Sequence, residues 1–182
     1  MGAATILVDE AYHEYVHDPS YATAIPIALE NPRVLVARTF SKVYGLAGIR
    51  AGYAIGLPAA LAPLRPHRLG NGVNVLASAA GVAALAQGGH IERERALNQE
   101  ALELTRRGFE SIGFPSEPSH ANFIMVDVKR DVREFITACR GERIQIGRVF
   151  PPLPTHARVS IGTMDEMRQA MEVFERVLAP PS

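Results

Sequence analysis

The chain has 182 residues, of which 47% are hydrophobic and 21% charged, enough apolar material for one domain or two small ones. Nineteen basic and nineteen acidic residues give a formal net charge of zero without a basic stripe, which argues against a nucleic-acid binder. The single cysteine, Cys139, excludes an intrachain disulfide, and no apolar run reaches the length of a membrane span. These features predict a globular cytoplasmic protein.

The first part of the chain carries three short apolar runs that are typical of buried strands. They span residues 5–8, 33–38 and 51–56. None alternates as a half-exposed antiparallel strand does, so we predict a parallel sheet covered by helices, with helical segments at 59–68 and 78–87. Because the first run opens the chain, three parallel strands would leave two long edges, which further chain segments or a partner should cover.

The second part begins with a long amphipathic helix, predicted over residues 90–111 and ended by Gly113 and Pro115. Its inward stripe is predicted to contain Leu97, Ala101, Leu104 and Gly108. The elements expected after it are a strand at 122–128, a helix at 132–140, strands at 144–149 and 157–161, and a final helix after Thr163 whose capping box includes Glu166. We therefore predict one domain at 1–90, followed at 91–182 by the linking helix and a small α+β domain.

Two groups of polar side chains directly follow predicted strands. The first is residues 9–12 (D-E-A-Y), and the second is residues 39–42 (T-F-S-K), which continues to Arg50. Taken singly, Asp9 is explained as a turn residue and Lys42 as a solvated loop lysine. Taken together, they bring a carboxylate, a phenol, two hydroxyls, an amine and a guanidinium to the edge where open α/β sheets bind ligands.

A pyridoxal-phosphate (PLP) enzyme needs this set of groups. The lysine amine forms a Schiff base with the cofactor aldehyde. A carboxylate keeps the pyridine nitrogen protonated, so that the ring accepts electrons from the substrate. Hydroxyl donors and an arginine fork suit the phosphate dianion.

At these residues the sequence resembles a known family. The D-E-A-Y segment resembles that of fold-type-I aminotransferases, and residues 38–53 resemble the S-K-x-x-G-L-A-G-x-R-x-G-Y signature of the histidinol-phosphate aminotransferase group. The resemblance continues at 121–123 and 157–163, so it covers the lysine-bearing, C-terminal half of a class I/II PLP-dependent aminotransferase. It implies an α/β fold: part of the large domain, with a mostly parallel, incomplete sheet, followed by a small α+β domain.

The resemblance also implies roles for individual residues. Lys42 would carry the Schiff base and move the proton during transamination. Asp9 would pair with the pyridinium nitrogen, and Tyr12 would bind the ring hydroxyl. The residues that would hold the phosphate are Ser41, Arg50 and, as a further candidate, Thr39. Arg158 would bind the substrate α-carboxylate, and Arg148 would lie near the distal end of the substrate.

The implied activity is amino transfer from histidinol phosphate or a related amino acid, with 2-oxoglutarate as acceptor and a homodimer as the full-length assembly. The alternatives are a PLP-dependent decarboxylase or carbon–sulfur lyase of the same fold, which share the lysine chemistry, or a non-catalytic fragment. Because the family is about twice as long, we expect the isolated chain to be inactive.

A competing motif lies at residues 13–17 (H-E-Y-V-H), which match the H-E-x-x-H pattern of zinc proteases. That pattern requires a helix with two histidines one turn apart, but the Asp-Pro pair at 18–19 would end a helix there. No convincing third metal ligand stands out, although Glu30 could be proposed. We therefore interpret His13 and His17 as exposed loop residues and predict no metal site.

Overall fold

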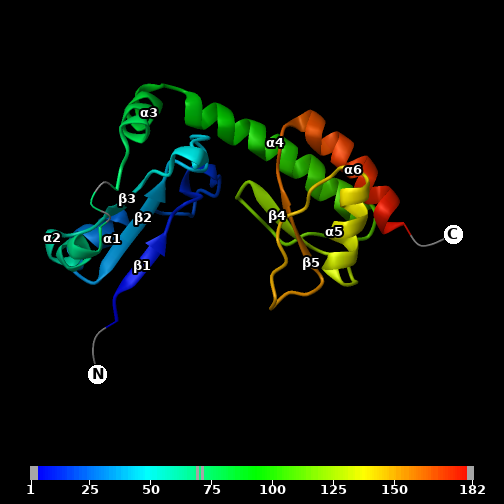
Figure 1. Ribbon diagram of the computed structural model, residues 1–182, viewed down its shortest axis with the longest axis horizontal. Helices are drawn as coiled ribbons and strands as arrows, with labels where there is room; N and C mark the ends of the chain where they lie inside the picture. The colour runs from blue at the N-terminus through cyan, green and yellow to red at the C-terminus, as the bar shows by residue number, and fades with distance from the viewer. Residues whose placement is uncertain (1–3, 69, 71, 180–182) are drawn as a thin grey trace. The chain divides into compact units, whose positions relative to one another are not determined.

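The computed structural model describes residues 4–68, 70 and 72–179 of the chain. The chain divides into two compact units, Met1–Arg93 and Glu94–Ser182, and the boundary lies in the first turn of α4 (His90–Ser111) (Figure 1). Among the described residues, no helix combines the length and the apolar character that crossing a membrane requires.

The described part of the first unit is built on a sheet of β1 (Ile6–Asp9), β2 (Val34–Thr39) and β3 (Gly52–Ile55), with β2 in the centre. β1 and β2 run parallel, and their register places Asp9 opposite Ala37. The first half of β2 is buried, whereas most of β1 and β3 is exposed. All three strands expected in this unit are therefore present, and the central one carries the core.

The direction of β3 differs from the parallel arrangement expected for all three strands. β3 is antiparallel to β2, with Thr39 opposite Gly52. The connecting segment 40–51 contains the short 3-10 helix η2 (Ala47–Ile49) and returns the chain at the same end of the sheet. A parallel return needs a crossover to the opposite end, usually through an α-helix. The prediction of a third parallel strand was therefore wrong.

Two helices of the first unit show how local sequence sets their ends and contacts. α1 (Ile25–Glu30) packs on β2 and buries Ala28 completely. α3 (Val75–Ala86) begins where the Asn74 side chain accepts a hydrogen bond from the Ala77 N–H at 2.8 Å, which satisfies one of the free donors of the first turn.

The helix expected over 59–68 is divided. It consists of α2 (Pro58–Leu61) and the 3-10 helix η3 (Ala62–His67). Pro63 and Pro66 lack the N–H that a continuous α-helix would use, so the second half tightens into a 3-10 turn.

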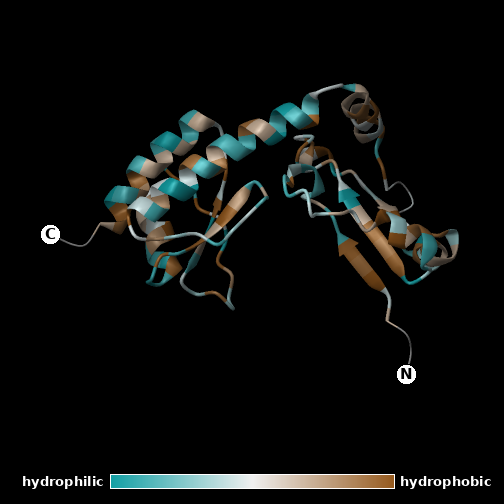
Figure 2. Ribbon diagram, turned by 180° about the vertical axis from the view of Figure 1, so that it is seen from behind, coloured by the Kyte–Doolittle hydropathy of each residue, from teal (hydrophilic) through white to brown (hydrophobic). Residues whose placement is uncertain are grey.

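Apolar side chains remain exposed on one sheet edge and on α3. Ile6 and Leu7 of β1 are 56% and 61% exposed, and Val75 and Leu76 of α3 are more exposed still. In Figure 2 the brown colour of β1 and β2 marks their hydrophobic residues. This exposure agrees with the open strand edge expected from the sequence, while a segment or partner that covers it stays a prediction.

In its described residues, up to 179, the second unit combines a two-stranded sheet with three helices. Its elements after α4 are β4 (Phe123–Asp127), α5 (Val132–Gly141), β5 (His156–Ser160) and α6 (Met164–Leu178). β4 and β5 are antiparallel, with Ile124 opposite Val159. α6 begins with the capping box predicted from the sequence, because Thr163 and Glu166 bond reciprocally to each other's backbone N–H.

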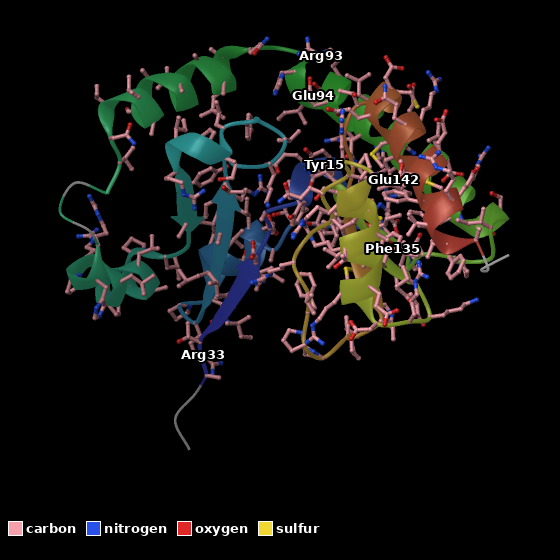
Figure 3. The ribbon with its side chains drawn as sticks, turned by 45° about the vertical axis from the view of Figure 1, so that its right-hand side comes forward. Tyr15, Arg33, Arg93, Glu94, Phe135 and Glu142 are labelled. Carbon is pink, nitrogen blue, oxygen red and sulfur yellow. The ribbon has the colours of Figure 1, made fainter. Side chains whose placement is uncertain are left out.

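The core of the second unit is centred on three phenylalanines. Phe174 of α6 stacks on Phe109 of α4 at 5.1 Å between ring centroids and contacts Phe135 of α5 at 5.7 Å. All three rings are almost completely buried, and Phe135 is labelled on α5 in Figure 3. One cluster of aromatic rings therefore joins α4, α5 and α6.

The buried stripe of α4 is only partly the predicted one. Ala101 is buried as expected, but Leu97 is 55% exposed. The stripe instead includes Thr105 and Phe109. Thr105 is tolerated there because its hydroxyl donates to the Ala101 carbonyl at 2.7 Å, so the buried polar atom keeps a partner.

The segment 144–149, expected to be a strand, is not one. It alternates in burial, with Ile146 inside, and the Gly147 N–H donates to the Arg158 carbonyl of β5 at 3.2 Å. Glycine weakens a strand, and the prolines that follow at 151, 152 and 154 have no N–H for a ladder. The segment therefore contacts β5 through the Gly147 hydrogen bond but does not form a strand ladder with it.

Candidate active site

The end of β1 carries the first group of candidate residues. Asp9 is the last residue of the strand, is exposed, and accepts the Ala11 N–H at its Oδ1 at 3.0 Å. The chain then turns into the short 3-10 helix η1 (His13–Tyr15), and Tyr12 lies half-buried just before it. A carboxylate and a phenol are therefore held within one turn after the strand.

The end of β2 carries the second group. Thr39 Oγ1 donates to the Ala51 carbonyl at 3.3 Å and accepts the Ser41 N–H at 3.0 Å. The Lys42 carbonyl accepts the Gly45 N–H at 2.8 Å in a turn, where Gly45 has a φ of +68° that a residue with a side chain rarely adopts. These bonds fold the segment 40–51 into a compact loop.

The two groups meet at Lys42 and Tyr12. The Lys42 ammonium Nζ lies 4.8 Å from the centroid of the Tyr12 ring, within the range of a cation–π contact. Because β1 and β2 are parallel neighbours, Asp9 and Thr39 also lie at the same end of the sheet. The structure thus brings the lysine to the strand ends that carry the carboxylate and the phenol.

Arg50 reaches the same end of the sheet from β3. It precedes β3 by two residues, and the first residue of β3, Gly52, pairs with Thr39. Arg50 adopts a left-handed backbone, with a φ of 58°, and its Nη1 donates to the Ala47 carbonyl at 2.9 Å. Its guanidinium is exposed and keeps further donors for an anion.

A buried ion pair that sequence reasoning missed lies beside these residues. The Glu10 carboxylate accepts hydrogen bonds from Arg38 Nε and Nη2 at 3.0 and 2.8 Å. Burial raises the pKa of Glu10, but the Ala24 N–H, Arg38 and Thr23 outweigh it, so this pKa is below its usual value. Opposite charges at the ends of two adjacent strands were the sequence signal for this pair.

The two arginines assigned to the substrate lie in the second unit. Arg158 of β5 places its Cζ 4.1 Å from the centroid of the Phe123 ring and donates from Nη1 to Ser160 Oγ at 3.2 Å. A Cβ on Gly147 would lie 2.9 Å from the Arg158 carbonyl, so only glycine fits there. Arg148 is exposed, with its Cζ 4.9 Å from the Phe150 ring centroid.

Residues 13–17 do not form the helix that a zinc pair needs. η1 is a single 3-10 turn that ends at Tyr15, so His17 lies outside it and is exposed. His13 is half-buried, against expectation, because its Nδ1 lies 3.1 Å from the Tyr21 hydroxyl. Within residues 4–68, 70 and 72–179, no three His, Cys, Asp or Glu side chains are grouped as metal ligands.

The groups at the strand ends fit a phosphorylated aromatic aldehyde. An amine lies on the face of a phenol ring, a carboxylate stands at the neighbouring strand end, and hydroxyls and a guanidinium occupy the adjoining loop. The residues that could hold such a cofactor are Asp9, Tyr12, Thr39, Ser41, Lys42 and Arg50. All six belong to the first unit, so these candidate groups come from one unit of the chain.

The chain is similar to known proteins over nearly its whole length. The histidinol-phosphate aminotransferases of Symbiobacterium thermophilum and Caldicellulosiruptor saccharolyticus are 40% and 37% identical to the chain over 175 residues, 95% of its length. The crystal structure of histidinol-phosphate aminotransferase from Sinorhizobium meliloti, in complex with pyridoxal-5'-phosphate, superposes with a TM-score of 0.86 at 27% identity and covers 96% of the chain. The chain spans about half the length of these proteins, 48%, 49% and 48% respectively.

The fold expected from the resemblance is confirmed by this superposition, which matches both units to half of a PLP aminotransferase. The sequence profile of aminotransferase class I and II matches residues 3–174, which is nearly the whole chain. The chain therefore belongs to the aminotransferase class I and II family.

Proposed function

We propose that the chain is the lysine-bearing part of a PLP-dependent aminotransferase, acting on histidinol phosphate or a related amino acid with 2-oxoglutarate as acceptor. The observation that carries the proposal is the contact between Lys42 Nζ and the Tyr12 ring, beside Asp9 at the ends of two parallel strands. The similarity to histidinol-phosphate aminotransferases supports this substrate class.

Three residues would act on the reacting part of the cofactor. The half-buried Lys42 amine would bind the aldehyde carbon and later move a proton. Asp9 would hold a proton on the pyridine nitrogen, and the Tyr12 hydroxyl would hydrogen-bond the ring hydroxyl. When bound, PLP supplies the ring that accepts electrons from the substrate.

The phosphate would be held by the loop between β2 and β3. Ser41 is half-buried in this loop, and Thr39 is half-buried at the end of β2, where it accepts the Ser41 N–H. The exposed Arg50 fork can donate two parallel hydrogen bonds to phosphate oxygens. The bond from Arg50 to the Ala47 carbonyl and the bond from Thr39 to the Ala51 carbonyl fix both ends of the loop. An anchored phosphate would hold the aldehyde in reach of Lys42.

The second unit would bind the substrate. Arg158 has one face on the Phe123 ring, which leaves the edge of the guanidinium to grip a carboxylate with two hydrogen bonds. Arg148 would contact the distal group of the substrate. We assign Met1–Arg93 to the PLP-binding large domain and Glu94–Ser182 to the linking helix and small domain, in a cytoplasmic homodimer when full-length.

The proposal can be tested by locating the cofactor on the chain. Lys42 and Lys129 are the two lysines of the sequence, so a lysine-bound cofactor has two alternatives. Lys129 is an internal control, because its Nζ donates to the Gly113 carbonyl and lies over Phe114 in the other unit. After incubation with PLP, reduction with borohydride and digestion, peptide mass mapping should find the label on Lys42 well above Lys129.

A Lys42→Ala variant should lose that label, and a Lys129→Ala variant should keep it. Equal labelling of both lysines at limiting PLP would show that Lys42 has no special environment for the cofactor. That result would overturn the proposed function.

A further inference from the structure

We infer that the Glu10–Arg38 ion pair is a positioning device that holds the segment of Asp9 and Tyr12 against the segment of Lys42. This inference rests on the proposed function, because it concerns the same site. Neither residue is among those proposed to hold the cofactor, so the pair would act through its neighbours in the chain.

The Glu10 carboxylate is held by donors from two segments of the first unit, residues 23–24 and Arg38 of β2. It is 3% exposed and accepts hydrogen bonds from the Ala24 N–H at 2.7 Å, from Thr23 Oγ1 at 2.9 and 2.8 Å to its two oxygens, and from two nitrogens of Arg38. Arg38 Nη2 also donates to Thr23 Oγ1 at 3.1 Å. Both carboxylate oxygens therefore have partners, which fixes the side chain in one orientation.

The position of the pair in the sheet gives it influence over the site. Glu10 directly follows Asp9, and Arg38 directly precedes Thr39. Successive residues of an extended chain point to opposite faces of a sheet, so the pair supports these strand ends from the face opposite Asp9 and Thr39. Tyr12 lies two residues from Glu10 and Lys42 four residues from Arg38, so a shift of either partner moves one side of the site.

A gain in folding stability does not by itself explain why this ion pair is present. Removing two charges from water costs much of what their attraction returns, and apolar side chains often stabilise such a position better. Two guanidinium donors on the one carboxylate oxygen Oε2 supply a fixed direction between two strand ends, which apolar contacts do not. The lowered pKa of Glu10 agrees with a carboxylate that is charged at neutral pH, because its hydrogen bonds outweigh the burial that raises this pKa.

The test uses the 182-residue chain and the ratio of borohydride-fixed PLP on Lys42 to that on Lys129. Glu10→Gln keeps the shape but replaces one carboxylate oxygen by an NH2 group, which must then face a donor, either Arg38 or the Ala24 N–H. The paired variant Glu10→Gln/Arg38→Gln removes both charges and so leaves none unpaired, and Arg38→Lys keeps the charge without the fork. We expect the ratio to fall about ten-fold in the first two, as loss of supporting hydrogen bonds does at metal sites, and less in Arg38→Lys.

Folding of each variant is followed by circular dichroism and by hydrogen exchange of the β2 peptide. A folded variant with a reduced ratio supports the inference, and wild-type ratios in folded variants overturn it. Unfolding of all three variants would assign the pair to stability alone and would also overturn it. A wild-type chain without preference for Lys42 contradicts the proposed function instead, so the two failures are distinguishable.

Discussion

Replacement of Phe174 by alanine should destabilise the second unit and leave the first unit almost unchanged. Phe174 is 1% exposed and stacks on Phe109 at 5.1 Å while it contacts Phe135 at 5.7 Å. It is the one ring of the three that touches both others, so its removal opens a cavity where α4, α5 and α6 meet.

The expected loss is about 3–5 kcal/mol in the free energy of unfolding of this unit, the usual cost of removing a buried phenyl ring. Each aromatic pair contributes about 0.5–1.5 kcal/mol of that loss. A typical domain is stabilised by roughly 5–15 kcal/mol, so the variant unit should stay folded but exchange its amide hydrogens about a hundred-fold faster or more.

Hydrogen exchange with peptide resolution measures this effect for each unit separately. Peptides of β4 and β5 should lose protection in Phe174→Ala, while the β2 peptide should not. Leu97→Ala is the matched control on α4, because Leu97 is 55% exposed and its truncation should change stability by less than about 0.5 kcal/mol. A loss below about 1 kcal/mol, or an equal loss in β2, would refute the assignment of Phe174 to a separate core.

Three further results are expected. Thr163→Ala removes the capping box and should lower the unfolding free energy of the second unit by about 1 kcal/mol. Hydrogen exchange of α6 peptides measures this loss, and unchanged protection would contradict it. The pKa of Glu10 in the folded chain lies below 4.5, so its contribution to the free energy of unfolding is full above that pH and is lost on acidification. The urea midpoint should therefore fall more steeply between pH 7 and 3 in the wild type than in Glu10→Gln. Parallel pH profiles of the two proteins would disprove this. Amino transfer from histidinol phosphate to 2-oxoglutarate, measured as glutamate formed, should be at least about a hundred-fold slower for the chain alone than for a full-length relative. The reason is that poorer positioning of cofactor and substrate raises the activation barrier by several kcal/mol. Comparable turnover would show that half the length suffices for activity.

Local patterns predicted the strand ends and the residues after them. The apolar runs before Asp9 and Thr39 are strands, and the motifs that follow place Lys42 beside Tyr12. The capping box of α6 was also predictable, since Thr163 and Glu166 interact within one helical turn.

Features that depend on distant residues were not predictable in the same way. The direction of β3 is seen only in its pairing with β2, and the segment 144–149 makes a hydrogen bond from Gly147 to β5 without becoming a strand. The ion pair of Glu10 with Arg38 joins residues 28 positions apart, and its energetics depend on burial that the sequence does not show.

The most direct test of the central claim is a crystal structure of the chain with PLP. We expect density continuous from Lys42 Nζ into the cofactor, with the Asp9 carboxylate at about 2.7–2.9 Å from the pyridine nitrogen, as charged hydrogen bonds require. The Tyr12 hydroxyl should point to the ring oxygen, and Arg50 to the phosphate. Cofactor density on Lys129, or an Asp9 carboxylate farther from Lys42 than the span of the ring and its aldehyde, would contradict the account.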